Sequence, residues 1–140
     1  MFSKLFNRGT KVVKQLNSKD LFEAAVAAGV LTAWADGEFS DSEFDGLLNL
    51  LEANPALEAF KADIPGLVES YSKQMEVSFR AGKRNLMKQV TDCQGDHDES
   101  EQVLILALDV ADIDGKVSPE EEKVLSDIAQ ALGLNIKDYE

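Results

Sequence analysis

The sequence is poor in the residues that build metal centres, disulfide frameworks and tight turns. It holds one cysteine, Cys93, and one histidine, His97, with three prolines and nine glycines. A single cysteine excludes an intramolecular disulfide framework and a Cys-rich zinc site. A single histidine excludes the catalytic metal sites that use two or three. So few prolines and glycines leave little room for an all-β fold with many tight turns.

Basic residues are scarce as well. The 140 residues carry 14 lysines and arginines against 26 aspartates and glutamates, a formal net charge of 14 − 26 = −12. This charge repels phosphate backbones, so we expect no binding to nucleic acid. A chain of this length with 44% hydrophobic and 29% charged residues is typical of one globular domain, which we expect to span residues 1–140.

The basic residues gather at the start of the chain. Residues 1–19 contain no acid, whereas the remaining 140 − 19 = 121 residues hold nine basic and 26 acidic side chains, a net charge of 9 − 26 = −17. Apolar residues recur at helical spacing between the cations, which predicts a basic amphipathic helix over residues 1–19. The cations of this segment are Lys4, Arg8, Lys11, Lys14 and Lys19.

Two interpretations of the basic segment stay open. It could contact an anionic membrane or an acidic partner through Lys4, Arg8, Lys11 and Lys14, or it could dock on the acidic body of its own chain. Lysines interrupt the apolar stretch that a secretory signal needs, so we do not expect one here.

Two apolar runs predict helices buried at the centre of a bundle. Residues 21–35 read LFEAAVAAGVLTAWA and residues 103–113 read VLILALDVADI, so each run is apolar on nearly every face. Both are shorter than the roughly 20 residues that cross a bilayer, and acidic residues interrupt both of them. We therefore expect no transmembrane segment.

The sequence repeats itself at a distance of 111 − 33 = 78 residues. Residues 33–40 read AWADGEFS and residues 111–118 read ADIDGKVS. In each copy an apolar helix precedes Asp-Gly, a pair that turns the chain. The repeat predicts two helix–loop–helix units, at about residues 21–52 and 99–132.

A capping box is expected at the start of the second helix of each unit. Ser40 stands three residues before Glu43, and Ser118 three residues before Glu121, which is the spacing at which a serine and a glutamate satisfy each other's backbone N–H groups. Phe39 precedes the first cap and Val117 the second, so each can staple its helix to the core. Phe39 suits such a staple rather than a ligand cage.

The segment between the units predicts further helices. Residues 55–60 suit a short helix, the apolar spacing from Ile64 to Phe79 predicts a helix of about four turns, and another helix is expected after Gly82. Residues 94–98 are polar and predict a loop. The whole pattern predicts an all-α fold: a single-domain bundle of about seven or eight helices, built from two pseudo-symmetric helix–Asp-Gly loop–helix repeats.

The acidic loops form the candidate metal site. Residues 112–121 match positions three to twelve of a calcium-binding loop, but Val110 occupies position one and its side chain has no oxygen. The first loop offers fewer ligands still. Each loop is therefore half a site, and the two could pool their carboxylates on one Ca²⁺ or Mg²⁺. The candidate ligands are Asp36, Glu43, Asp112, Asp114 and Glu121.

A metal-free interpretation explains the same residues. Aspartate makes each turn, and glutamate closes the capping box of the helix that follows. A helix N-terminus also carries partial positive charge, which stabilises a nearby carboxylate and opposes a cation. Both interpretations stay open at this stage.

Other chemistry-bearing residues favour structural roles. Asp109 and Asp112 lie three positions apart, but no nucleophile or base stands near them, so they fit an acidic rim better than a catalytic pair. His97 suits a solvated loop. Cys93 follows an aspartate, which disfavours its thiolate.

The paired motifs carry a family resemblance. AWADGEFS near the start and VADIDGKVSPEEE near the end resemble the tellurite-resistance TerB family, whose domain also occurs in a membrane-anchored DnaJ co-chaperone. The similarity covers about residues 2–138. It implies an all-α domain of two related halves, an acidic metal-binding surface near the Asp-Gly loops, and a role in resistance to tellurite and other stresses. The first loop departs from the second, because Trp34 and Ala35 stand where the second has Asp112 and Ile113.

The resemblance implies a non-enzymatic, cytoplasmic binding module that holds Ca²⁺ or Mg²⁺ and engages other Ter-type or membrane-associated proteins. The alternative is a metal-free scaffold or regulator that docks to a membrane protein through the basic N-terminal helix, at the inner face of the membrane. A small hydrolase that uses the acidic cluster is a third class, which needs a pocket and a metal-activated water.

Overall fold

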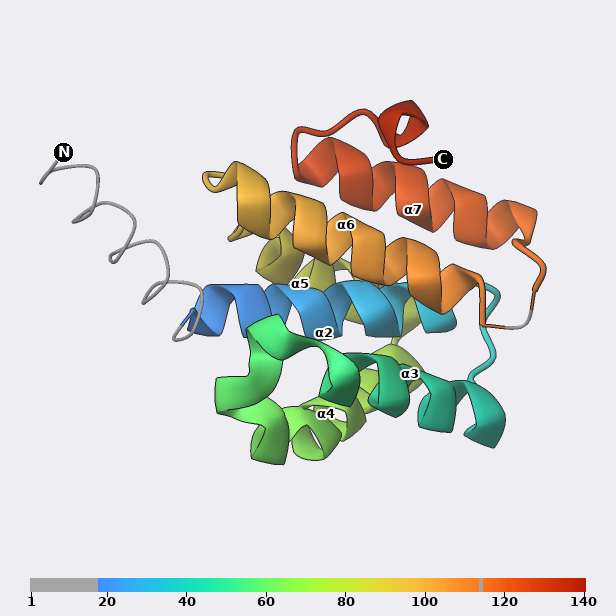
Figure 1. The fold of residues 1–140 in the computed structure, drawn as a ribbon. Coiled ribbons are helices and arrows are strands. Elements are labelled where there is room, and N and C mark those ends of the chain that lie inside the picture. Colours follow the sequence, from blue (N-terminus) through green and yellow to red (C-terminus); the bar gives the residue numbers. More distant parts are fainter. Residues whose placement is uncertain (1–17, 114) are drawn as a thin grey trace, which may run out of the picture.

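The computed structural model describes residues 18–113 and 115–140, which are helical with short connections and hold no strand. The expected all-α class is confirmed. The elements along the chain (Figure 1) are α2 (Lys19–Ala33), α3 (Asp41–Ala53), η1 (Pro55–Asp63), α4 (Ile64–Val77), α5 (Phe79–Thr91), α6 (His97–Ala111), α7 (Pro119–Ala131) and η2 (Ile136–Asp138).

The number of α-helices in the described residues is six, lower than the seven or eight helices expected. Two further short segments, Pro55–Asp63 and Ile136–Asp138, form 3₁₀ helices and are not included in this number. The predicted basic helix, with Lys4, Arg8, Lys11 and Lys14, lies outside the described residues.

Lys19 belongs to α2 and not to the basic segment that was expected to include it. Ser18 begins the helix, because its hydroxyl accepts a hydrogen bond from the backbone N–H of Leu21 at 3.1 Å. Serine is a strong N-cap, since its oxygen satisfies a backbone donor that has no partner within the helix.

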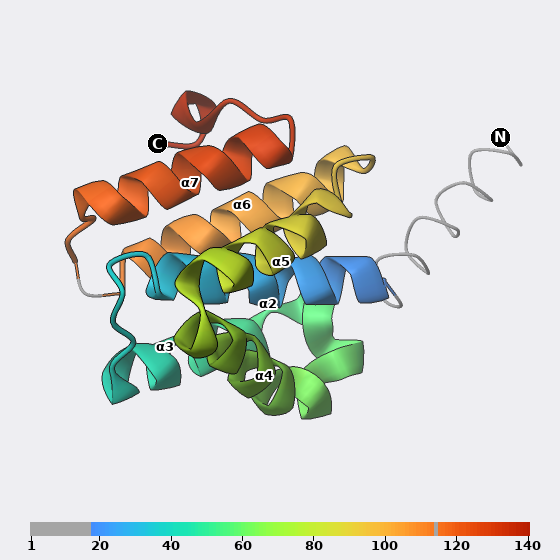
Figure 2. The same cartoon turned by 180° about the vertical axis from the view of Figure 1, so that it is seen from behind.

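Helix α2 lies at the centre of the bundle and packs against each of the other five α-helices of the described chain (Figures 1 and 2). Its residues are buried from Leu21 to Ala33 with the exception of Glu23, as the apolar run predicted. Small side chains allow this close approach. At Gly29, an added Cβ would lie 2.6 Å from the Cδ1 atom of Leu47 in α3.

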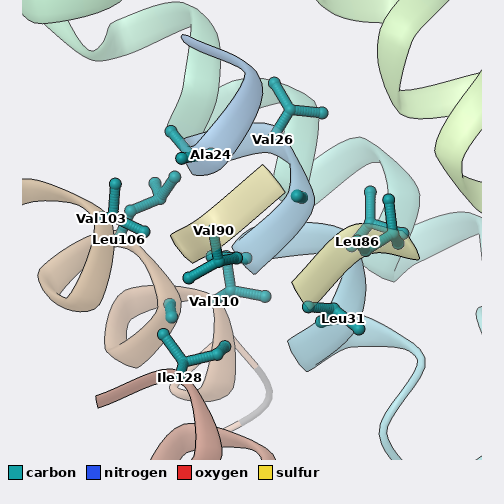
Figure 3. Packing of buried hydrophobic residues seen from close by; sticks show 14 of the residues in the cluster. Ala24, Val26, Leu31, Leu86, Val90, Val103, Leu106, Val110 and Ile128 are labelled. Atoms are coloured by element: carbon teal, nitrogen blue, oxygen red, sulfur yellow. The ribbon is translucent and has the colours of Figure 1, made fainter. Parts of the chain in front are cut away.

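Helix α6 runs parallel to α2 and lies beside it, while α7 and α5 run in the opposite direction (Figures 1 and 2). Side chains of three helices meet in the core (Figure 3): Val103 and Val110 of α6, Ala24 of α2 and Val90 of α5. No described helix is both long enough and apolar enough to cross a membrane.

The 78-residue repeat reappears in local structure. Adding 78 to the bounds of α2 gives those of α6 (19 to 97 and 33 to 111), and adding it to those of α3 gives those of α7 (41 to 119 and 53 to 131). Gly37 and Gly115 both adopt positive φ, 85° and 78°, which glycine tolerates without steric cost. The packing of the two units as symmetry-related halves stays a prediction.

Two helix boundaries differ from the prediction. Helix α4 ends at Val77, so Phe79 begins α5 instead of continuing α4. Ser78 causes the break, because its backbone is extended and its hydroxyl accepts from the N–H of Ala81 at 3.2 Å. The apolar spacing continues across this corner, which is why periodicity alone did not reveal it. Gly82 consequently lies inside α5 and does not precede it.

His97 is the first residue of α6 and not part of a polar loop. Asp96 caps the helix, since its Oδ1 accepts from the N–H of Glu99 at 3.1 Å. The imidazole is exposed, as expected, and its Nε2 lies 3.4 Å from a carboxylate oxygen of Glu101.

We expect Gly82→Ala to destabilise the bundle by about 1–3 kcal/mol. An added Cβ would lie 2.8 Å from both the carbonyl oxygen of Gln74 and the Cα of Met75, so α5 would have to move away from α4. Urea unfolding measures the change. Gly66→Ala is the control, because open space surrounds that position, and alanine there should stabilise the helix by up to about 1 kcal/mol. Equal effects of the two substitutions would contradict the close α4–α5 contact.

Candidate functional site

The two acidic loops lie at the same end of the molecule, because α2 and α6 are parallel and both end there (Figures 1 and 2). A contact joins the second loop to the first unit. Ile113 lies on the surface of α3, where a Cβ added to Gly46 would be 3.1 Å from its Cδ1 atom and 3.2 Å from its Cγ2 atom. The absence of a side chain at Gly46 therefore lets the second loop pack against the first unit.

Glu43 and Glu121 line one small hollow at this end, together with Ala33, Val110 and Ile113. The two glutamates come from different units, and each is half-buried. The other three lining side chains are apolar. The structure thus brings two of the five candidate ligands to a single place.

Capping boxes hold both glutamates in position. Oε1 of Glu43 accepts from the backbone N–H of Ser40 at 3.4 Å, and Oε1 of Glu121 accepts from that of Ser118 at 3.0 Å. In return, each serine hydroxyl accepts from the glutamate N–H, at 3.2 Å and 3.1 Å respectively. The two predicted capping boxes are confirmed, and they restrict the directions in which these carboxylates point.

The remaining candidate ligands are placed differently. Asp36 is exposed and makes the turn, since its Oδ1 accepts from the N–H of Glu38 at 3.1 Å. Asp112 is exposed at the C-cap of α6, and neither residue lines the hollow. Asp114 lies outside the described residues. Within residues 18–113 and 115–140, no group of three or more histidine, cysteine, aspartate or glutamate residues is arranged to hold a metal ion.

The C-terminal end of α6 is strongly negative. The pKa of Asp109 is raised, first by partial desolvation and then by the charge of Asp112. A raised carboxyl pKa next to a second acid is the expected result of an unneutralised acidic cluster. Both side chains are exposed, which fits the expected acidic rim.

The first loop carries an aromatic cluster that the second loop lacks. Phe39 stacks on Trp34 with ring centroids 5.7 Å apart and meets Phe44 edge-on at 5.8 Å. Phe39 and Phe44 stand at the N′ and N4 positions of α3, which is the geometry of a hydrophobic staple. The equivalent positions of α7 hold Val117, which is exposed, and Glu122. The staple expected at Val117 is therefore wrong, because N4 of α7 is a charged residue, and only the first of these two units is stapled in this way.

Gly46 and Ile113 are the residues of this end that sequence reasoning missed. The available signal was an isolated glycine inside a helical pattern, which often marks a close packing contact. The sequence did not reveal which side chain fills the space beside it, since Ile113 lies 67 residues further along the chain (113 − 46).

Cys93 is buried away from the loops, where its thiol lies 3.4 Å from the carbonyl oxygen of Asp20 and 3.9 Å from a carboxylate oxygen of Glu99. Burial, and then the charge of Glu99, raise the pKa of Cys93 to about 12. The thiolate is therefore disfavoured, as the sequence predicted.

We expect native Cys93 to react with iodoacetamide only when the chain unfolds. The folded-state pKa of about 12 lies above the ordinary value of 9.0, so the thiol is protonated at pH 8. Its contribution to the free energy of unfolding is complete below pH 9 and is lost as the pH rises towards 12. A Cys93→Ala chain that carries Ser126→Cys, at an exposed position, is the control. Equal labelling rates for the two folded chains would contradict the buried, protonated thiol.

Comparison with known proteins places this arrangement in a family. A model of the family described as tellurite resistance protein TerB matches residues 22–140, which include both loops and all of α3 to α7. No curated protein and no solved structure matches the chain significantly. Because the match covers far more than half of the sequence, the chain belongs to the TerB family.

Proposed function

We propose that the chain is a non-enzymatic tellurite-resistance and stress-response protein of TerB type, whose acidic end binds a divalent cation and engages protein partners. Family membership supports the role in resistance. The observation that carries the cation proposal is the hollow lined by both Glu43 and Glu121. The one thiol of the chain, Cys93, is buried and protonated, so it does not supply a nucleophile.

The number of oxygen ligands available at the hollow suits Mg²⁺ better than Ca²⁺. Magnesium keeps several of its waters and binds through one or two carboxylates, whereas calcium takes six to eight oxygen ligands. Glu43 and Glu121 supply two carboxylates at the hollow. Additional ligands for Ca²⁺ would have to come from the neighbouring loop aspartates, of which Asp36 and Asp112 lie outside the hollow.

Electrostatics favour a cation at this end but keep its binding weak. Two carboxylates beside apolar side chains repel each other, and a bound cation relieves that repulsion. The N-termini of α3 and α7 also point their partial positive charge towards the same glutamates, which opposes a cation. The net result is a low-affinity site that responds to cation concentration.

Exposed carboxylates close in sequence to Glu43 and Glu121 form the surface that we propose for a basic protein partner. Glu38, Asp41 and Asp45 come from the first unit, and Glu120 and Glu122 from the second. A cation bound between the units would hold the two halves of this surface together, so cation and partner would bind cooperatively.

We expect Mg²⁺ at ten times its dissociation constant to stabilise the chain by about 1.4 kcal/mol, a gain that Glu43→Gln/Glu121→Gln removes. Glutamine at the same position preserves the capping box, so the helices should still form. Thermal unfolding with and without Mg²⁺ measures the effect. Glu58→Gln/Glu69→Gln is the matched control, because it removes the same number of negative charges at exposed positions in η1 and α4. Stabilisation by Mg²⁺ that the double variant retains would place the cation elsewhere and overturn the proposed site.

A further inference from the structure

We infer that the loop end of the molecule is an interface between two copies of this chain, in which the corner between α4 and α5 of each copy contacts the α6–α7 loop region of the other. We call these two halves the basic corner, which comprises Val77, Phe79, Arg80 and Arg84, and the acidic loop region, which comprises Ile113, Val117, Glu120 and Glu122. The inference does not depend on the proposed cation site, since none of these residues is a proposed ligand. It rests on the proposed partner surface, which includes Glu120 and Glu122, and it names a second copy of this chain as the basic partner.

Helices α4 and α5 carry a charge opposite to that of the surrounding chain. Residues 64–91 hold five basic and two acidic side chains, a net charge of 5 − 2 = +3. The other residues from 18 to 140 hold five basic and 24 acidic side chains, a net charge of 5 − 24 = −19. A positive patch on such a chain is complementary to the acidic surface of another copy.

The cations of α5 form one exposed stripe that the fold leaves unneutralised. Arg80, Arg84 and Lys88 follow one another at four-residue spacing, so they share a helix face, and all three are exposed. Like charges at this spacing destabilise an isolated helix. Lys83 differs, because its Nζ lies 3.2 Å from Oδ2 of Asp127 in α7. Arg80 and Arg84 have no such ion pair with any described carboxylate.

Exposed apolar side chains accompany both halves of this surface. Val77 is 79% exposed and Phe79 is 40% exposed at the basic corner, beside a shallow and largely apolar hollow lined in part by Lys73, Val77 and Ala81. Ile113 and Val117 are each 39% exposed in the acidic loop region. Pairing the two halves would therefore bury apolar surface as well as match charge.

The two halves lie towards the same end of one molecule (Figures 1 and 2), because α5 begins where α2 and α6 end. A surface with a positive half beside a negative half is complementary to itself after a two-fold rotation. Two-fold dimers require this property, since each contact occurs twice with the roles of the copies exchanged. Such a dimer is closed, because both the basic corner and the acidic loop region of each copy are occupied by the other.

Sedimentation velocity of the full chain over a wide concentration range tests the inference. At about 0.15 M salt we expect a reversible dimer that weakens at about 1 M, where the screening length falls from about 8 Å to 3 Å. Arg80→Glu/Arg84→Glu and Glu120→Lys/Glu122→Lys should each raise the dissociation constant about tenfold or more. An equimolar mixture of the two variants should regain the dimer, because every reversed charge then meets its opposite.

Control variants distinguish the loss of this charge pairing from an effect of net charge and from misfolding. Lys61→Glu/Lys137→Glu makes the same change in net charge as Arg80→Glu/Arg84→Glu, at exposed positions in η1 and η2, and should dimerise like the wild type. Val77→Ser should weaken the dimer without any change in charge. Circular dichroism confirms that each variant is folded.

Three results would overturn the inference. The first is a wild-type chain that stays monomeric at every concentration, and the second is a mixture of folded variants that does not regain the dimer. The third is a monomeric chain that binds phosphatidylglycerol vesicles through Arg80 and Arg84, which would assign the basic corner to a lipid surface.

Discussion

The parallel packing of α6 against the buried helix α2 is the contact on which the rest of the structure depends. Alanines and Gly29 make α2 narrow enough to contact each of the other five described α-helices. Because α2 and α6 point the same way, both Asp-Gly loops emerge at one end of the bundle (Figure 1). The surface that we propose to be functional is thus a consequence of helix direction rather than of any single loop sequence.

The same carboxylates serve folding and, in our proposal, function. Glu43 and Glu121 each close a capping box, which contributes to helix formation whether or not a cation is present. That structural role also fixes where the carboxylates lie, so the hollow exists before any ligand arrives. Preorganisation of this kind lowers the entropic cost of binding. We expect the proposed cation site to be weak, because its two ligands also close the capping boxes.

Features determined by neighbouring residues could be predicted from the sequence, and features determined by distant contacts could not. The capping boxes predicted at Ser40 and Ser118 were confirmed, because a serine and a glutamate three residues apart interact locally. The α4–α5 corner was missed because Ser78 broke a helix whose apolar spacing continued. The contact of Ile113 with Gly46 was missed because it joins two units far apart in sequence. Predicting the site required knowing which helices pack together.

A double-mutant cycle on the two glutamates tests most directly whether the units converge. Glu43→Gln, Glu121→Gln and the combination are compared by urea unfolding without divalent cations and at low salt. If the carboxylates share one hollow, either single substitution removes their repulsion, so we expect the effects to depart from additivity by about 0.5 kcal/mol or more, and less at high salt. Additive effects at every salt concentration would contradict the convergence of the two loops.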